Sequence, residues 1–310
     1  MPNAFRLPAV LTTGLLLVLG MAGCNASPFE DGEASAGAGG SEAPLLVGSA
    51  NFPESETLAE IYAGALNAGG VPAATKPRIG SREVYVRAVQ DGSIDLVPDY
   101  SGNLLRYLDE GTSARGAEEV MKELPGKLPE GLAVLEPAAA EDKDSLVVTQ
   151  QTAAKHGLES LEDLGRICDE IALGMPPEAQ ERPQGLPGLK AVYGCVPKEF
   201  VPFNDGGGAL TLQALLDDRI QAANIFTTSP LIAANNLVAL EDTKDLFAAQ
   251  QVLPLISTGT VGGEAQDILN KVSQELTTED LMQLNEKVSG DAKQNPKDAA
   301  AAWLQDKGLA

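Results

Sequence analysis

The chain of 310 residues contains one histidine and three cysteines, and this scarcity excludes several kinds of chemistry. A Ser-His-Asp or Cys-His set can be built only around His156, which lies in the polar segment Lys155-His-Gly157. No Cys-x-x-Cys pair is present, so the common redox motif is absent and zinc ligands are few. Aspartate and glutamate are plentiful, but no spacing singles out a metal site or a catalytic pair. We expect no enzymatic activity, no cofactor and no metal ion.

Basic residues are also scarce. Lysine and arginine total 22 against 44 acidic residues, which gives a formal net charge of −22. A field of this sign repels nucleic acid, so no nucleic-acid partner is expected, and it favours a cationic or zwitterionic ligand over an anion. Taken alone, the net charge is better explained by plain solubility. The run Gly206-Gly-Gly208 precedes an expected helix but lacks the Lys-Ser/Thr of a phosphate loop, so we interpret it as a turn.

Long apolar runs are absent after residue 23, and the one before it is short. Residues 11–21 carry no charge, follow Arg6 and end in small residues before Cys24, as in a signal peptide. The segment Met-Ala-Gly-Cys24 resembles a bacterial lipobox, which implies cleavage before Cys24 and acylation of its sulfur. We therefore predict a signal peptide at 1–23 and a lipidated flexible tether at 24–44, rich in Gly, Ala, Ser and Glu. Ordinary secretion with a free cysteine is the alternative.

Two cysteines remain beyond the tether, Cys168 and Cys195. An exported protein meets oxidising conditions, in which an even pair of cysteines usually closes a disulfide. We predict a structural disulfide between these two residues.

The rest of the chain alternates between strand and helix patterns, typical of an α/β fold. Strands are expected at 45–49, 73–79, 94–97, 145–149, 171–173, 199–203, 221–226, 237–240 and 252–256, and helices at 54–67, from 81, at 186–193 and at 209–216. The opening reads β-α-β-α-β, the start of a mostly parallel sheet, and the tail from Glu264 is helical in pattern.

This order of elements is consistent with two α/β lobes. Lobe 1 is predicted to contain residues 45–141 and 240–310, and lobe 2 residues 142–239. Two extended crossings, near 136–144 and near 235–241, would join them. The C-terminal helices would then return to pack on the first lobe.

Two segments of the chain look like copies of one another. Residues 88–101 and 214–227 each read as a helix end, a tight turn, a short apolar strand, an aromatic and a hydroxyl, which places Tyr100 on Phe226. In open α/β sheets, ligands bind beyond the carboxyl ends of strands, so the two rings are predicted to face one cleft. Core aromatics are the alternative, because alternating segments also produce such a pattern by chance.

Four segments together resemble a known family: Val47-Gly-Ser-Ala-Asn-Phe52, Asp95-Leu-Val-Pro-Asp-Tyr-Ser-Gly102, Gly185-Leu-Pro-Gly-Leu189 with Tyr193-Gly194, and Leu237-Val-Ala-Leu-Glu-Asp242. From about Leu45 onwards the chain is similar to the extracellular substrate-binding proteins of ABC importers for glycine betaine, choline and related osmoprotectants. The resemblance implies a type II periplasmic-binding-protein fold that closes by hinge motion on a small solute. It also implies ABC permease subunits as partners and a place on the outer face of the cell membrane. We expect a monomer.

Such proteins hold a quaternary ammonium in an aromatic cage and fix a carboxylate with basic and hydroxyl groups. By this resemblance Tyr100 and Phe226 fall on cage positions, and Arg182 falls near the carboxylate-binding arginine. Asn103 stands where threonine is often found, and the expected set is completed by Asn51 and Thr227.

The chain departs from the family pattern at two places. A lysine that some members carry near Asn51 is absent, and Asp144 stands where a third ring is expected. Asp142 and Asp144 would attract a cation, unless they belong to a solvated crossover, and Arg182 would be a surface charge if it does not bind the ligand. A clam-shell protein for another solute such as an amino acid, or a non-transport sensor or adhesin, is the alternative function.

The lipobox resemblance generates a direct test. Mass spectrometry of membrane-extracted protein is expected to find an acylated N-terminal Cys24, because two or more acyl chains anchor a protein stably. A Cys24→Ser variant supplies the control and should lack the added mass. A soluble product cleaved at another position would contradict the prediction.

Overall fold

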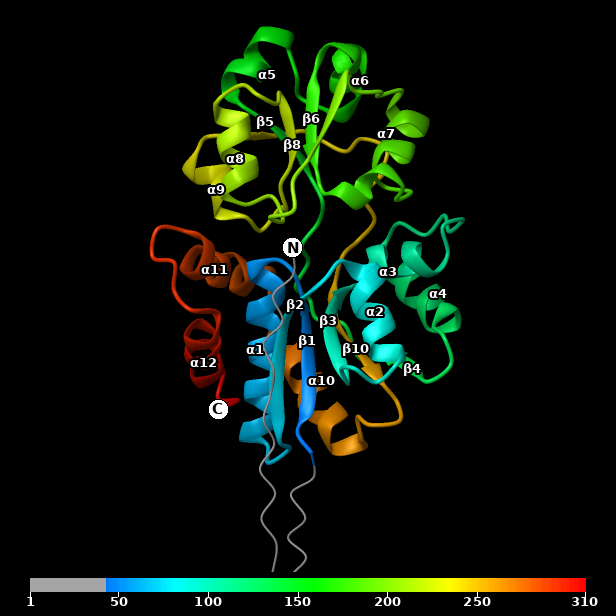
Figure 1. Ribbon diagram of the computed structural model, residues 1–310, viewed down its shortest axis with the longest axis vertical. Coiled ribbons are helices and arrows are strands. Elements are labelled where there is room, and N and C mark those ends of the chain that lie inside the picture. Colours follow the sequence, from blue (N-terminus) through cyan, green and yellow to red (C-terminus); the bar gives the residue numbers. More distant parts are fainter. Residues whose placement is uncertain (1–42) are drawn as a thin grey trace, which may run out of the picture. The chain divides into compact units, whose positions relative to one another are not determined.

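The computed structural model describes residues 43–310, so Cys24, the signal peptide and nearly all of the tether lie outside the described residues. Two mixed sheets, each with five strands within residues 43–310, form the framework (Figure 1). We call the first sheet with the helices packed on it the first lobe, and the second sheet with its helices the second lobe. The bounds predicted for the lobes from the sequence remain a prediction.

The first sheet has the strand order β2-β1-β3-β10-β4. β1 pairs in parallel with β2 and β3, as the opening of the sequence predicted, and β10 runs antiparallel to β3 and β4, so the sheet is mixed with one reversed strand. Its strands are β1 (Leu45–Ala50), β2 (Ala73–Gly80), β3 (Leu96–Tyr100), β4 (Leu132–Val134) and β10 (Val252–Ser257). Its helices are α1 (Pro53–Ala68), α2 (Arg82–Gln90), α3 (Ser101–Leu108), α4 (Ala117–Glu123), α10 (Gly263–Glu275), α11 (Thr278–Ser289) and α12 (Pro296–Asp306), with a 3-10 helix at Leu124–Lys127.

Helix α1 organises the core of the first lobe. It begins with Pro53, whose fixed φ suits a first helical position, and it ends before Gly69-Gly70, where Gly70 has a φ of +88°. Leu58, Ile61 and Leu66 are fully buried, and α10, α11 and α12 pack against the same helix (Figure 1). The predicted return of the C-terminal helices to the first lobe is confirmed.

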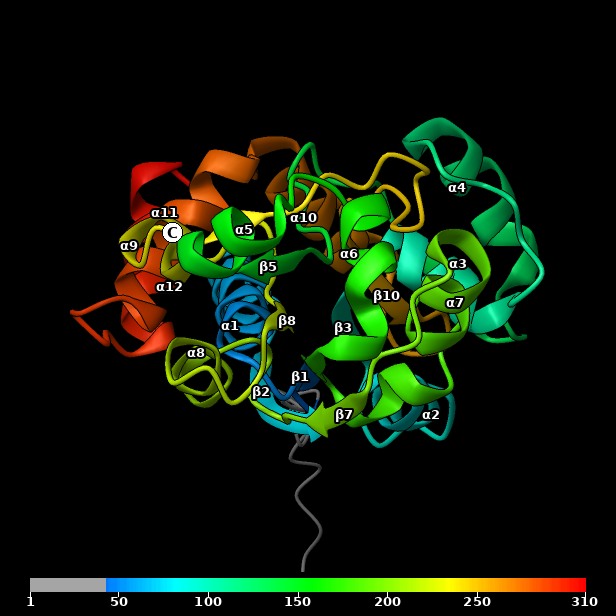
Figure 2. The same ribbon diagram turned by 90° about the horizontal axis from the view of Figure 1, so that it is seen from above.

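The second sheet repeats this arrangement with the order β7-β6-β8-β5-β9. Its strands are β5 (Leu146–Val148), β6 (Ala172–Met175), β7 (Glu199–Pro202), β8 (Ala222–Asn224) and β9 (Val238–Ala239). Its helices are α5 (Gln150–His156), α6 (Leu161–Ile167), α7 (Leu186–Tyr193), α8 (Ala209–Leu216) and α9 (Pro230–Ala234), with 3-10 helices at Cys168–Glu170 and Pro177–Gln180. In the view from above, β7 and β8 lie over the region of β1 and β2 (Figure 2).

Strands β3 and β8 occupy equivalent places in the two sheets. Each lies between a parallel strand that begins its β-α-β series, β1 or β6, and an antiparallel strand, β10 or β5. A matching contact supports the alignment. A Cβ added at Gly48 of β1 would lie 2.5 Å from the Ile94 side chain, and a Cβ added at Gly174 of β6 would lie 2.5 Å from the Ile220 side chain. The predicted correspondence of these two segments is therefore confirmed.

The two crossings between the lobes lie between β4 and β5 and between β9 and β10. The second crossing comes later than expected, because residues 238–239 pair with β5 as an edge strand. Leu246 and Phe247 still pack in the second lobe, whereas Ala248 packs in the first. The crossing expected near residues 235–241 therefore contains strand β9, and the chain passes between the lobes after Phe247.

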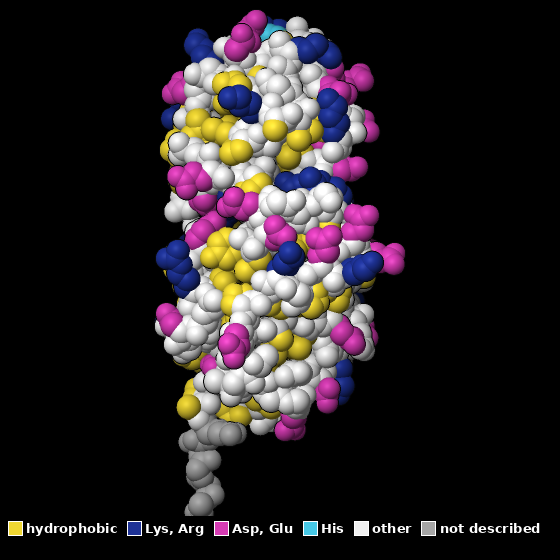
Figure 3. Space-filling view, turned by 90° about the vertical axis from the view of Figure 1, so that its right-hand side faces the viewer, with side chains coloured by type: hydrophobic (Ala, Val, Ile, Leu, Met, Phe, Trp, Pro, Cys, Tyr) yellow, Lys and Arg dark blue, Asp and Glu magenta, His cyan; other side chains and the backbone are white. Residues whose placement is uncertain are grey.

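Several short helices were not predicted from the sequence, among them α3, α4, α5, α6 and α9. With eight residues or fewer, these helices are too short to show a clear periodicity, although α6 carries a capping box between Ser160 and Asp163. No helix within residues 43–310 combines the length and apolar composition needed to cross a membrane. On the face drawn in Figure 3, acidic and basic side chains are interspersed.

Cys168 and Cys195 form a disulfide in the core of the second lobe, as predicted. The bond joins the ends of α6 and α7, with 5.1 Å between the two Cα atoms and a sequence separation of 27 residues. Both cysteines are buried, so the bond is shielded from reductants in the folded protein.

Closing a loop of this length should stabilise the fold by about 3–4 kcal/mol on the chain-entropy model. We therefore expect the Cys168→Ala/Cys195→Ala double variant to unfold at lower denaturant concentration, as followed by circular dichroism. Thiol titration of the unreduced, denatured wild-type protein should detect no free thiol from this pair. Two reactive thiols in that titration would contradict the prediction.

Candidate ligand-binding site

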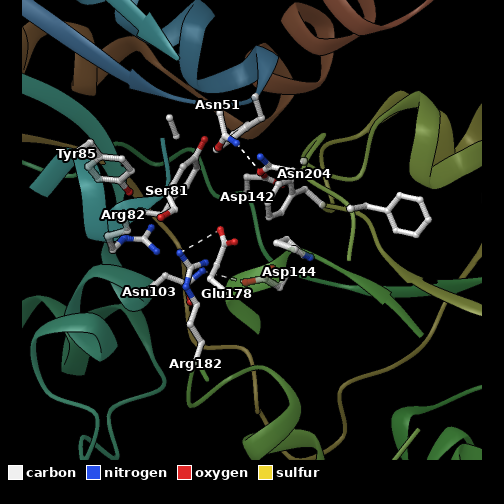
Figure 4. A pocket seen from close by; sticks show the side chains of 17 residues that line it. Asn51, Ser81, Arg82, Tyr85, Asn103, Asp142, Asp144, Glu178, Arg182 and Asn204 are labelled. Atoms are coloured by element: carbon white, nitrogen blue, oxygen red, sulfur yellow. Dashed lines mark hydrogen bonds and ion pairs between the residues drawn. The ribbon is translucent and has the colours of Figure 1, made fainter. Parts of the chain in front are cut away.

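A cleft between the lobes is lined by side chains that follow the carboxyl ends of strands from both sheets. Phe52 follows β1, Tyr100 ends β3, Asn204 follows β7 and Phe226 follows β8. Parallel strands deliver their carboxyl ends to one edge of a sheet, and the two sheets turn these edges toward the same space. In Figure 4 Tyr85 and Asn204 lie on opposite sides of this cavity.

Three aromatic rings form one cluster in the cleft. The ring centroid of Phe52 lies 6.1 Å from that of Tyr100 and 5.4 Å from that of Phe226, within the range of direct ring contacts. The structure therefore brings Tyr100 and Phe226 to the same cleft, as the sequence predicted. Sequence reasoning missed Phe52, although the signal was present: it follows β1 much as Tyr100 ends β3.

Tyr100 is also part of the core of the first lobe. Its side chain is buried, and its hydroxyl donates a hydrogen bond of 2.6 Å to Oε1 of Glu54. The two interpretations, cleft ring and core aromatic, thus both describe Tyr100, because one edge of the ring packs inward while the residue lines the cleft.

Two buried carboxylates lie next to the rings. Glu54 accepts hydrogen bonds from the hydroxyls of Tyr100 and Thr228 and from the Asn285 side chain. Asp142 lines the cleft and is 4% exposed, so the solvated-crossover interpretation is wrong for this residue. Neither carboxylate forms an ion pair with a basic side chain of residues 43–310.

Burial raises the pKa of Asp142 well above its usual range, and the negative charge of Glu54 raises it further. Hydrogen bonds to Asp142, among them the one from the backbone N–H of Thr228, oppose this shift without cancelling it. Two acidic groups that lack a compensating cation therefore share one buried region beside the rings.

Asp99 fixes a second group of side chains at the end of β3. This fully buried carboxylate binds Arg82 through a hydrogen bond of 2.6 Å from Nη2 and one of 3.1 Å from Nε, and it accepts the hydroxyl of Tyr85 at 2.8 Å. The same carboxylate accepts the backbone N–H of Tyr100 at 2.7 Å. Arg82 and Tyr85 are thereby held in fixed orientations on the wall of the cleft.

Arg182 lines the cleft, as expected, but its guanidinium is already paired. Its Nε and Nη2 each donate a bond of 3.1 Å to the carboxylate of Glu83 across the cleft, and Nη2 lies 3.5 Å from Glu178. Partial burial alone would raise the pKa of Glu83, but the hydrogen bonds from Arg182 dominate and lower it to about 2. The bridge between the lobes therefore stays charged throughout the neutral pH range.

The remaining predicted residues bridge the lobes by hydrogen bonds. Asn51 donates to Oδ1 of Asn204 at 2.6 Å, and the two face each other in Figure 4. Asn103 donates to Oδ2 of Asp144 at 2.9 Å and accepts from the side chain of Gln184 at 3.0 Å.

Thr227 does not line the cleft. It is exposed, and its hydroxyl donates to Asp142 at 3.2 Å while accepting the backbone N–H of Lys143. The prediction of direct ligand contact by Thr227 receives no support from this position, because its side chain is exposed and does not line the cleft. Thr227 instead helps to hold Asp142.

The glycine run forms the turn that the sequence suggested, and the turn approaches the other lobe closely. Gly206 has a φ of +63°, and a Cβ added there would lie 2.6 Å from the Cβ of Phe52. The amides that begin α8 are occupied, because Asp205 accepts the N–H groups of Leu210 and Thr211. This loop therefore serves close contact between the lobes.

Metal chemistry finds no support in the described part of the chain. Within residues 43–310, no three His, Cys, Asp or Glu side chains are grouped so that they would hold a metal ion.

The sequence from residue 43 to 306 matches the family described as the substrate-binding domain of ABC-type glycine betaine transport systems. The chain is 29% identical over 280 residues to the glycine betaine-binding protein YehZ of Escherichia coli, covering 86% of this chain and 91% of that protein. The apo structure of YehZ from Escherichia coli superposes with a TM-score of 0.61 at 26% identity, covering 87% and 100% of the two chains.

A crystal structure of a glycine betaine/carnitine/choline ABC transporter protein shares the fold, with a TM-score of 0.67 at 20% identity and coverage of 86% and 99%. The fold is that of type II periplasmic binding proteins. Because the family match spans most of the described chain, the protein belongs to the substrate-binding domains of ABC-type glycine betaine transport systems.

Proposed function

We propose that this substrate-binding component of an ABC importer captures a small quaternary-ammonium solute, such as glycine betaine or choline, between its two lobes. The observation that carries the proposal is the cluster of Phe52, Tyr100 and Phe226 beside the uncompensated carboxylates of Glu54 and Asp142. Relatives named for glycine betaine and for carnitine support the same class of ligand. Members of this family act outside the cytoplasm.

Both physical components of the site favour a cation. A ring that faces a quaternary ammonium contributes about 0.5–2 kcal/mol, so three rings supply part of the roughly 8 kcal/mol that micromolar binding requires. A buried carboxylate adds Coulomb attraction in a region of low effective dielectric. A cation beside Asp142 also favours its ionised form and so opposes the effect of burial and of Glu54 on its pKa, which a neutral ligand cannot do.

Recognition of a carboxylate on the ligand requires a different part of the cleft. Arg182 is the basic group that the family resemblance assigns to this task, and its bonds to Glu83 and Glu178 would have to be shared with the ligand. Asn51 and Asn204 are neutral donors on opposite lobes that would contact the same group.

Transport follows from capture by closure of the lobes and delivery of the solute to the permease subunits. Lipidation at Cys24 would hold the protein on the outer face of the membrane near that permease, and two or more acyl chains suffice for stable anchoring. Contacts that cross the cleft, such as Glu83–Arg182 and Asn51–Asn204, stabilise the closed arrangement that a permease would bind.

The role of the rings is tested by replacements that keep apolar volume. Phe52→Leu and Phe226→Leu remove a ring face while leaving an apolar side chain, so each should weaken choline binding by about three- to thirtyfold. Phe200→Leu is the matched control, because Phe200 is half-buried in β7 and does not line the cleft. Calorimetry with choline and with its neutral isostere 3,3-dimethylbutanol measures the part of the affinity that depends on charge.

The wild-type protein should prefer choline to the neutral isostere, and the two cleft variants should lose most of that preference. Equal binding of the two ligands by the wild-type protein, or an equal effect of Phe200→Leu, would contradict a cation site. A thermal-shift panel of betaines, carnitine and amino acids then identifies the solute, since a ligand at one hundred times its Kd stabilises the fold by about 2.7 kcal/mol.

Closure is tested at Gly206, where the two lobes approach each other closely. Gly206→Ala adds backbone strain of about 1 kcal/mol at positive φ together with a Cβ against Phe52, so ligand affinity should fall at least tenfold. Gly157→Ala is the matched control: Gly157 has a φ of +65° at the end of α5, and nothing lies within 4 Å of an added Cβ. Both variants should lose similar stability, measured by thermal unfolding without ligand, but Gly157→Ala should keep wild-type affinity. Unchanged affinity in Gly206→Ala would show that this contact is not used in binding.

A further inference from the structure

A side chamber adjoins the cleft. Its wall includes Ser81, Arg82, Asn103, Glu178 and Arg182, all of which also line the cleft, so the two cavities are neighbours. Beyond these shared residues the chamber extends toward Arg106 and Tyr107 of α3 and toward Gln184 of the second lobe. None of these three residues lines the cleft that holds the aromatic cluster.

Arg106 has unused hydrogen-bonding capacity in this chamber. The residue is 4% exposed, its Nε is buried without a partner, and its guanidinium forms no hydrogen bond or ion pair with residues 43–310. Burial lowers the pKa of Arg106 to about 10, with a further contribution from Arg115, so the side chain remains positively charged at neutral pH. A largely buried charge without a protein partner is unfavourable, so this guanidinium is open to an anionic partner from the chamber.

The other charged groups around the chamber are already occupied or exposed. Arg82 is bound to Asp99, and Arg182 is bound to Glu83 and Glu178. Asp242, the carboxylate whose field reaches Arg106, accepts bonds from Tyr193, Leu246 and Phe247. Glu110 and Glu181 lie on the exposed rim, where water screens them.

Gln184 supplies a second unpartnered group in the same chamber. Its side chain is buried, its Nε2 donates to Asn103, and its Oε1 accepts no hydrogen bond from residues 43–310. A buried donor on Arg106 and a buried acceptor on Gln184 together match a ligand group that carries both a negative charge and a hydroxyl proton.

We infer that the chamber binds the anionic end of a zwitterion longer than glycine betaine, with its carboxylate on Arg106 and a neighbouring hydroxyl on Gln184. The inference rests on the proposed function, because the quaternary ammonium of the same ligand occupies the aromatic cluster. In glycine betaine one methylene separates the two charges, and a longer spacer carries the carboxylate farther from the rings toward Arg106. The chamber thereby selects for chain length between the two charges.

The test uses the full chain, purified in detergent, and four ligands: choline, glycine betaine, 4-trimethylammoniobutyrate and carnitine. Carnitine is 4-trimethylammoniobutyrate with one added hydroxyl. Arg106→Met keeps a long unbranched side chain and removes the charge, and Arg106→Lys restores a charge without the planar fork. Arg87→Met is the matched control, because Arg87 is an exposed arginine on α2. Calorimetry measures each affinity, and thermal unfolding with and without sodium butyrate measures anion binding independently of the rings.

We expect Arg106→Met to weaken the two long zwitterions at least tenfold, as is typical for loss of a hydrogen-bonded charge pair, with less than a twofold change for choline. Arg106→Lys should recover part of that loss. Carnitine should bind the wild-type protein more tightly than 4-trimethylammoniobutyrate, and a Gln184→Leu variant should abolish that difference. The unliganded Arg106→Met variant should melt no lower than the wild-type protein, because an unpaired buried charge has been removed.

Equal losses for all four ligands, or none, would overturn the inference. If no quaternary ammonium binds but butyrate raises the melting temperature of the wild-type protein and not of Arg106→Met, the proposed function fails and the anion site stands. If choline binds and neither the long zwitterions nor butyrate depend on Arg106, the proposed function stands and this inference fails.

Discussion

The carboxylate of Glu54 holds together parts of the protein that lie far apart in the sequence. It lies in the first turn of α1, accepts the Tyr100 hydroxyl at the end of β3, and is held by Thr228 of the second lobe and Asn285 of α11. A buried carboxylate without a cation is tolerated only when its lone pairs are fully used, and this requirement fixes the tyrosine ring and ties the lobes together. The position of the Tyr100 ring and a contact between the lobes therefore both depend on one group.

The carboxylates in and around the cleft fall into two groups, those with a basic partner and those without one. Carboxylates with basic partners, Asp99 and Glu83, position arginines on the walls, whereas carboxylates without such partners, Glu54 and Asp142, lie beside the rings. Opposite charges that are already paired leave little net field, so the proposed preference for a cation rests on the unpaired groups. Arg106 has the complementary property on the positive side, since it too lacks a partner among the described residues.

The sequence predicted the strand ends well and the polar network poorly. Apolar strands followed by Tyr100 and Phe226 are visible in one dimension, because strand periodicity is local and the carboxyl end of a strand is a defined place. Phe52 could also have been predicted, because it directly follows the apolar strand β1. Glu54, Asp99 and Arg106 could not be recognised from their neighbours in sequence, since each acquires its role from partners, or from the lack of partners, contributed by elements far along the chain.

By itself, the sequence determined the alternating α/β order, the correspondence of β3 with β8 and the identity of the two cysteines that pair, because these depend on local periodicity and on residue type. Tertiary structure alone decided that Tyr100 is both a core and a cleft residue, that Asp142 is buried, and that Arg182 is engaged by Glu83 while Arg106 is left unpaired. The physical reason is that the energy of a charge depends on its desolvation and on its nearest partners, and folding sets both by bringing together residues that are distant in sequence.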